Sequence, residues 1–212
     1  MRLIILDNGH GQETKGKRSP VWADGSQLLE WSYTRKVVNE IYIRLQASGI
    51  SCVKLVPEQT DTPLSERVRR ANGIAAMNSI SQVLLVSVHV NAAGLAGTAS
   101  GWEIHTSPGR TKADEYAQYF WDAANRILGD RFPIRGDWED GEGDRDSDLY
   151  ILRRTACPAV LTENLFMDNE TDCRFLLSDD GFRKIVQTFR KIFCIGFCAS
   201  PHGCEVLRGI VL

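Results

Sequence analysis

One stretch near the middle of the chain, Val83-Leu-Leu-Val-Ser-Val-His-Val-Asn91, constrains the fold most. A short run rich in Val and Leu is typical of a β-strand that is covered on both faces. Open α/β sheets bury strands in this way and place ligands and catalytic groups at the carboxyl ends of those strands. The run therefore predicts a central strand that delivers His89 to such an edge. A lone histidine is more often a hydrogen-bonded core residue, so other segments must decide its role.

The size and composition of the chain indicate one globular domain. It has 212 residues, of which 43% are hydrophobic and 25% charged. This length supports one substantial core but not two comfortable domains, so we expect a single domain over residues 1–212. The formal net charge of -2 gives no electrostatic reason to expect nucleic acid or an anionic membrane as a partner. Composition predicts no particular oligomeric state.

The sequence shows no targeting or membrane-spanning segment. Only four apolar residues, at positions 3–6, precede Asp7, which is far short of a signal-peptide core. No run approaches the roughly 18 apolar residues of a membrane span. We therefore expect a chain without a signal peptide that is cytoplasmic as synthesised.

The six cysteines are spread along the chain without a paired framework, so free thiols are expected. Cys194, Cys198, His202 and Cys204 lie close together in sequence and could be considered as a metal site. Their spacing fits no zinc pattern well, and the first two share one face of an apolar helical segment. We therefore interpret them as buried thiols.

Strand and helix patterns alternate along the chain. Strand-like runs occupy residues 2–7, 51–56, 83–90, 101–106, 149–153 and 159–163. Apolar residues recur at helical spacing from Trp31 to Leu45, with Gly49 just beyond the end. Helical spacing also covers residues 63–78, 111–128 and 182–193, and a short capped helix is expected near Asn169 and Asp172. This alternation predicts an α/β fold, a mainly parallel twisted sheet of about six strands with helices on both faces.

An acidic segment at residues 135–148 interrupts the alternation. It holds seven carboxylates and three glycines in fourteen residues, a composition that does not favour a packed core. The glycine and the closing glutamate of a calcium loop are out of register here. We interpret residues 137–148 as a mobile, solvated loop near the site and a candidate gate or peptide contact.

Three side chains from separate segments form a candidate metal-ligand set. His10 lies in a Gly-His-Gly loop after the first strand, Glu30 opens a helix, and His89 ends the central strand. Two imidazoles and one carboxylate are typical of a hydrolytic zinc centre, which keeps a fourth position for water. At such a centre the pKa of the bound water falls to about 7.

A second carboxylate is placed to move protons at such a centre. Glu163 lies at the carboxyl end of another predicted strand. A carboxylate there can accept the proton of the attacking water and pass it to a departing amine. Glu163 is therefore the candidate general base.

Short motifs around these residues agree in order, residue type and predicted context with one known family. They are Ile5-Leu-Asp-Asn-Gly-His-Gly11, Leu64-Ser-Glu-Arg67, Ser87-Val-His-Val-Asn-Ala92 and Pro158-Ala-Val-Leu-Thr-Glu163, together with Glu30 at a helix start. With them, residues 2–197 resemble the zinc-dependent N-acetylmuramoyl-L-alanine amidases. These bacterial and phage enzymes cut peptidoglycan between sugar and peptide.

The resemblance implies a zinc-hydrolase-like fold and specific roles. His10, Glu30 and His89 would bind one Zn²⁺, and Glu163 would be the catalytic carboxylate. Peptidoglycan or muropeptides would be the substrate, and Asn91 is a candidate substrate contact or a partner that orients His89. An enzyme of this kind would act at the cell wall as a released lysin or after removal of a leader.

The sequence departs from the family pattern at positions that flank the site. Asn8 stands where a small residue is usual, Val90 replaces a common alanine, and Leu165 occupies a place where the family often has glycine. These departures remove no ligand. Arg67 and Asn72 are expected to brace loops, and the remaining histidines, His105 and His202, are interpreted as structural.

The sequence also allows other interpretations. Glu30 could be a first-turn carboxylate favoured by the helix dipole, and Glu163 could be a buried ion-pair partner. The same metal site could serve a zinc peptidase that cuts stem peptides. A third alternative is a catalytically silent module that binds the cell wall.

Overall fold

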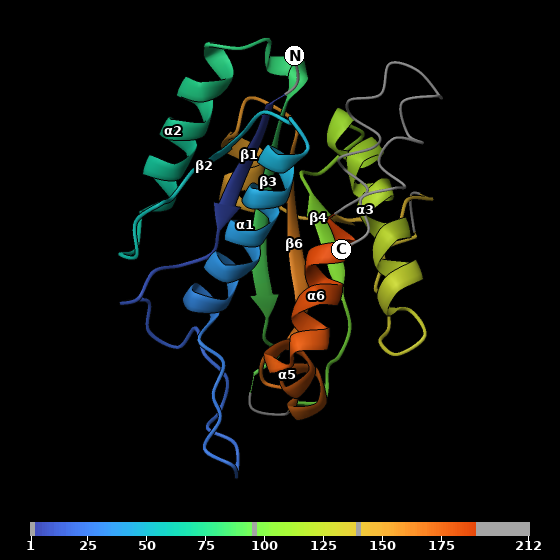
Figure 1. Ribbon diagram of the computed structural model, residues 1–212. Helices are drawn as coiled ribbons and strands as arrows, with labels where there is room; N and C mark the ends of the chain where they lie inside the picture. The colour runs from blue at the N-terminus through green and yellow to red at the C-terminus, as the bar shows by residue number, and fades with distance from the viewer. Residues whose placement is uncertain (1–2, 95–96, 139–140, 190–212) are drawn as a thin grey trace.

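A six-stranded sheet forms the centre of the protein (Figure 1). The computed structural model describes residues 3–94, 97–138 and 141–189. The strand order is β2-β1-β3-β6-β4-β5. The strands are β1 (Leu3–Asn8), β2 (Cys52–Lys54), β3 (Val83–Asn91), β4 (Glu103–Thr106), β5 (Arg145–Asp146) and β6 (Ala159–Phe166). Neighbours are parallel except β4 and β6, which are antiparallel. The expected mainly parallel sheet is confirmed.

Helices cover both faces of the sheet, as the sequence predicted (Figure 1). They are α1 (Glu30–Ala47), α2 (Leu64–Ala76), α3 (Lys112–Leu128), α4 (Tyr150–Arg154), α5 (Glu170–Leu177) and α6 (Asp179–Thr188), with a 3₁₀ turn at Ile80–Gln82. On one face Val86 and Val88 of β3 join the core beneath α1, α3 and α6. On the other, Val83 and Leu85 pack with residues of α2 and α4. The alternation of β3 side chains therefore explains its nearly continuous apolar sequence.

Two expectations for the second half of the chain are wrong. Residues 149–153 were expected as a strand, but they lie largely in α4, where the adjacent residues Ile151 and Leu152 are buried. A short apolar run cannot be assigned by periodicity alone.

The acidic segment is not simply a solvated loop, because it contains β5 and because Asp144 is buried and accepts a hydrogen bond from Thr106 Oγ1. A carboxylate can be buried there because a hydroxyl donor compensates it.

The capped helix after Asn169 is confirmed, since the Asn169 side chain accepts from the backbone N–H of Asp172 at the start of α5. Cys52, Cys157 and Cys173 are free, as expected, and all three are buried. The proposed thiols at Cys194, Cys198 and Cys204, with His202, lie outside the described residues. Among the described residues, no helix has the length and apolar character needed to cross a membrane.

A β-bulge lies at the carboxyl end of β6. His89 faces Glu163, but the next paired positions are Asn91 and Phe166, so β6 carries one more residue than β3. Leu165, in this extra length, is fully buried and has a φ of 64°. This left-handed conformation favours glycine, which gives a physical reason for the glycine that the resemblance implies at this position. The bulge follows directly after Glu163 and re-aims the end of the strand beside the site.

Candidate metal centre and catalytic site

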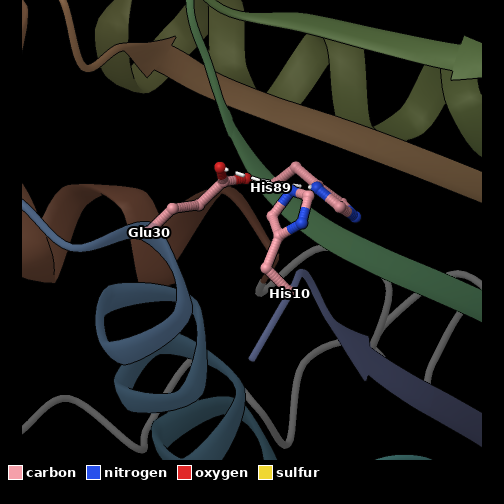
Figure 2. Close-up of side chains that lie close together, drawn as sticks. All are labelled: His10, Glu30 and His89. Atoms are coloured by element: carbon pink, nitrogen blue, oxygen red, sulfur yellow. Dashed lines mark hydrogen bonds and ion pairs between the residues drawn. The ribbon is translucent and has the colours of Figure 1, made fainter. Parts of the chain in front are cut away.

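Figure 2 shows His10, Glu30 and His89 pointing toward one another from three different elements. His10 follows β1, Glu30 is the first residue of α1, and His89 lies near the end of β3. One potential ligand atom from each residue lies within 4.8 Å of those of the other two. The structure therefore brings together the three side chains that the sequence singled out.

The spacing within this group suits a small divalent cation. Glu30 Oε2 lies 3.4 Å from His10 Nε2, and Glu30 Oε1 lies 3.2 Å from His89 Nδ1. Ligands bonded to zinc at about 2.0–2.1 Å in a tetrahedron are separated by roughly 3.4 Å. The imidazole rings meet edge to face at 5.2 Å between centroids. The carboxylate thus stands between two nitrogen donors at separations close to those of zinc ligands.

The environment of Glu30 supports the same interpretation. Its Oε1 accepts a hydrogen bond from the Val90 N–H at 3.1 Å, which fixes the carboxylate. Its Oε2 is buried and has no hydrogen-bond donor among the described residues. A buried polar atom without a partner is costly, and a cation between the three side chains would compensate it. The donor set therefore fits a divalent metal ion of the zinc type.

The charges of the three residues are coupled. Burial disfavours the charged form of Glu30, but the attraction of the His10 and His89 rings outweighs it, so the pKa of Glu30 lies below its usual value. Burial opposes the charged form of His89, yet the hydrogen bond to Glu30 and the nearby Glu163 raise the pKa of His89. Glu30 is therefore held as an anion beside both imidazoles.

The two glycines beside His10 serve packing within the protein. A Cβ atom at Gly9 would lie 2.6 Å from His89 Nδ1, and one at Gly11 would lie 2.1 Å from the backbone nitrogen of Asp61. Glycine at both positions therefore permits close approach to the His89 ring and to another loop. Gly9 is the residue that lets the His10 loop reach the end of β3.

Two arginines hold the backbone of His10 in place. His10 has a φ of 62°, a conformation that is unfavourable for residues other than glycine. Its carbonyl accepts hydrogen bonds from Arg35 Nη1 at 2.9 Å and from Arg67 Nη2 at 3.3 Å. Arg67 Nη1 also donates to Asp7 Oδ1 at 2.6 Å, with both side chains almost fully buried. Arg67 braces the loop, as the sequence predicted.

Glu163 lies beside the candidate metal ligands on the neighbouring strand. It faces His89 in the pairing of β3 with β6. Its Oε2 is buried without a hydrogen-bond donor among the described residues. Burial raises the pKa of Glu163 to about 8. The positive charge of His89 opposes this rise, and repulsion from Glu30 and Glu103 adds to it. Glu163 can therefore change its protonation state close to neutral pH, as a proton-transfer group must.

Asn91 and Glu103 extend this row of side chains. Asn91 Nδ2 donates to Glu103 Oε1 at 2.5 Å, so the Asn91 amide is directed to Glu103. Glu103 faces Glu163 in the antiparallel pairing of β4 with β6. Sequence reasoning missed Glu103, because nothing in the sequence shows that β4 runs in reverse and brings its first residue to this edge.

Asn72 and His105 each contact a neighbouring loop. Asn72 donates to the carbonyl of Arg154 and accepts from the N–H of Ala156, which braces the turn after α4 as expected. His105 Nδ1 lies 2.7 Å from Ser147 Oγ. These contacts tie loops together around the sheet.

A sequence profile of the N-acetylmuramoyl-L-alanine amidases matches residues 4–191. The chain belongs to this family. It is 30% identical over 188 residues to the endolysin of Bacillus phage SPP1, covering 88% of this chain and 62% of that protein. It is 24% identical to the amidase CwlM of Bacillus licheniformis, covering 88% of this chain and 65% of that protein. The chain thus spans less than two thirds of the length of these relatives.

Solved structures share the amidase fold. An N-acetylmuramoyl-L-alanine amidase from Clostridium difficile 630 superposes with a TM-score of 0.72 and 21% identity, covering 92% of this chain and 97% of that chain. The catalytic domain of CwlV from Bacillus (Paenibacillus) polymyxa gives a TM-score of 0.70 and 21% identity, covering 89% and 93%. The α/β sheet with its flanking helices is therefore the fold of this amidase family.

Replacing Arg67 by Met should destabilise the protein by about 3–5 kcal/mol, because Asp7 would stay buried without its charged partner. Urea unfolding followed by circular dichroism measures the change. Arg69→Met, two residues along α2 in an exposed pair with Glu66, is the matched control and should leave the unfolding midpoint unchanged. Equal midpoints for the two variants would contradict the bracing role of Arg67.

Proposed function

We propose that this chain is the catalytic domain of a zinc-dependent N-acetylmuramoyl-L-alanine amidase. It hydrolyses the amide that joins the lactyl group of N-acetylmuramic acid to the L-alanine of the stem peptide. The main support is the convergence of His10, Glu30 and His89. Within this group, Glu30 Oε2 is buried and has no hydrogen-bond donor among the described residues. We infer the reaction from the amidase family to which the chain belongs.

The first task of the chain's residues is to hold the metal. His10 and His89 supply nitrogen ligands and Glu30 an oxygen ligand, a set of three that leaves a fourth position. When bound, Zn²⁺ would polarise the lactyl carbonyl and lower the pKa of a coordinated water. The Val90 N–H fixes the orientation of Glu30, as outer partners of metal ligands commonly do.

The second task is proton transfer, which falls to Glu163. Its carboxylate accepts a proton from the attacking water as the new C–O bond forms at the lactyl carbon. It then gives the proton to the alanine nitrogen as the C–N bond breaks, which yields a lactyl carboxylate and a free amine. The raised pKa of Glu163 suits both halves of this exchange near neutral pH.

The natural substrate in this proposal is peptidoglycan or muropeptides released from it. The chain would meet this substrate at the cell wall, as a lysin set free from the cytoplasm or after a leader is trimmed. Digestion of purified sacculi tests the reaction itself. Mass spectrometry should find peptides with a free L-alanine amine and glycan with intact lactyl groups.

Chelation with 1,10-phenanthroline should abolish this release, and added Zn²⁺ should restore it. New ends inside the stem peptide would instead indicate a peptidase. Binding to sacculi without any release would indicate a silent wall-binding module. Either result would contradict the proposed amidase.

Separate variants should distinguish metal binding from proton transfer. Glu163→Gln should retain zinc and lose activity by about 10²–10⁴-fold, because it removes only the proton carrier. His10→Ala should lose both zinc and activity. Zinc content is measured by atomic emission and activity by muropeptide release. Glu170→Gln, at an exposed position at the start of α5, is the control and should match the unmodified protein. Full activity in Glu163→Gln would overturn the proposed mechanism.

A further inference from the structure

Asn164 directly follows Glu163 in β6 and is a polar residue without access to solvent. Its Nδ2 donates to the backbone carbonyl of His89 at 2.8 Å and to Thr162 Oγ1 at 3.0 Å. Its Oδ1 accepts from Trp102 Nε1 at 3.0 Å. A backbone carbonyl can only accept and an indole N–H can only donate, so these contacts allow a single orientation of the amide.

The contacts of this amide link three segments beside the candidate site. His89 belongs to β3, Thr162 belongs to β6, and Trp102 lies directly before β4. Burying an amide costs desolvation that an apolar side chain would avoid. What the amide adds is a set of directional contacts, which hold the three segments in one arrangement.

The chain immediately after Asn164 leaves the regular pairing of β6 with β3. Leu165 has a φ of 64°, which is unfavourable for leucine. The N–H of Phe166 donates to the side chain of Asp172, at 3.0 Å from Oδ2. The amide of Asn164 therefore lies where the bulge begins, and it anchors the backbone on the side of Glu163.

The position of the Glu163 carboxylate depends on that backbone. Glu163 Oε2 is buried and has no hydrogen-bond donor among the described residues, so no donor orients this oxygen. Glu163 pairs with His89 across β6 and β3. The hydrogen bond from Asn164 to the His89 carbonyl thus joins the backbone beside the proton carrier to the backbone of a candidate metal ligand.

We propose that Asn164 is a positioning residue of the reaction. Its buried amide fixes the end of β6 against β3 and so sets the separation of Glu163 from His89. This role rests on the proposed amidase function and assigns a residue that acts through its neighbours. The separation matters because a misplacement of about 1 Å at a reacting group can lower a rate by roughly 10²-fold.

Asn164→Ala tests this role, because it removes the amide. At saturating Zn²⁺ its kcat for muropeptide hydrolysis should fall about 10- to 100-fold, while KM stays within about twofold of that of the unmodified protein. Zinc affinity should weaken about tenfold, because a residue that holds a metal ligand is lost. Competition with a chromophoric chelator, starting from the metal-free protein, measures this affinity without any substrate.

Asn72→Ala is the matched control. The Asn72 amide also donates to a backbone carbonyl and accepts from a backbone N–H, but its partners, Arg154 and Ala156, precede the start of β6. Both substitutions remove hydrogen bonds and should lower the midpoint of urea unfolding. Only Asn164→Ala should also change kcat and zinc affinity, which a merely structural role would leave unchanged.

A milder variant decides the question if Asn164→Ala does not fold. Trp102→Phe removes only the indole donor to Asn164, and it should lower kcat and zinc affinity about two- to fivefold, as expected for one hydrogen bond. Trp121→Phe is its control, because the Trp121 indole is buried without an acceptor among the described residues. This control should match the unmodified protein.

The outcomes separate the two proposals. Unchanged kcat and zinc affinity in folded Asn164→Ala, or equal values in Trp102→Phe and Trp121→Phe, would overturn the positioning role. An unmodified protein that binds zinc but hydrolyses no muropeptide would overturn the amidase function. A tenfold loss of zinc affinity in Asn164→Ala would then still support the positioning role. Failure of the unmodified protein to bind zinc would overturn both proposals.

Discussion

The position of the Glu30 carboxylate between His10 and His89 is the constraint on which the rest of the site depends. A buried carboxylate loses its hydration and is tolerated only when charges and hydrogen bonds replace it. Here Glu30 Oε1 accepts a hydrogen bond from the Val90 N–H and lies beside His89 Nδ1, and Glu30 Oε2 lies 3.4 Å from His10 Nε2. This arrangement holds only while a helix start, a loop and a strand end meet at one point.

The fold keeps these three elements together through buried polar contacts. Asp7 accepts from Ser87 Oγ across β1 and β3 and pairs with Arg67 of α2. The same arginine reaches the carbonyl of His10. One buried network therefore joins the sheet, a helix of the opposite face and the ligand loop, so stability and the position of His10 are linked. Metal affinity and resistance to unfolding should accordingly respond together to changes in this network.

Local sequence patterns predicted the parallel core and, together with the family resemblance, singled out the side chains that the structure brings together at the candidate site. The Val-rich run that ends at His89 predicted a central strand, and the end of β6 predicted the place of Glu163. The direction of β4 could not be predicted, because strand pairing depends on tertiary contacts. For that reason Glu103 went unnoticed. Residues 149–153 were predicted as a strand because so few apolar residues do not distinguish the periodicity of a helix from that of a strand.

Anomalous diffraction at the zinc absorption edge, on crystals grown with Zn²⁺, tests the zinc site most directly. One strong peak is expected, bonded at about 2.0–2.2 Å to His10, Glu30 and His89, with Glu163 beside it and outside the three protein ligands. A peak bonded to other residues, or an empty site at saturating zinc, would contradict it.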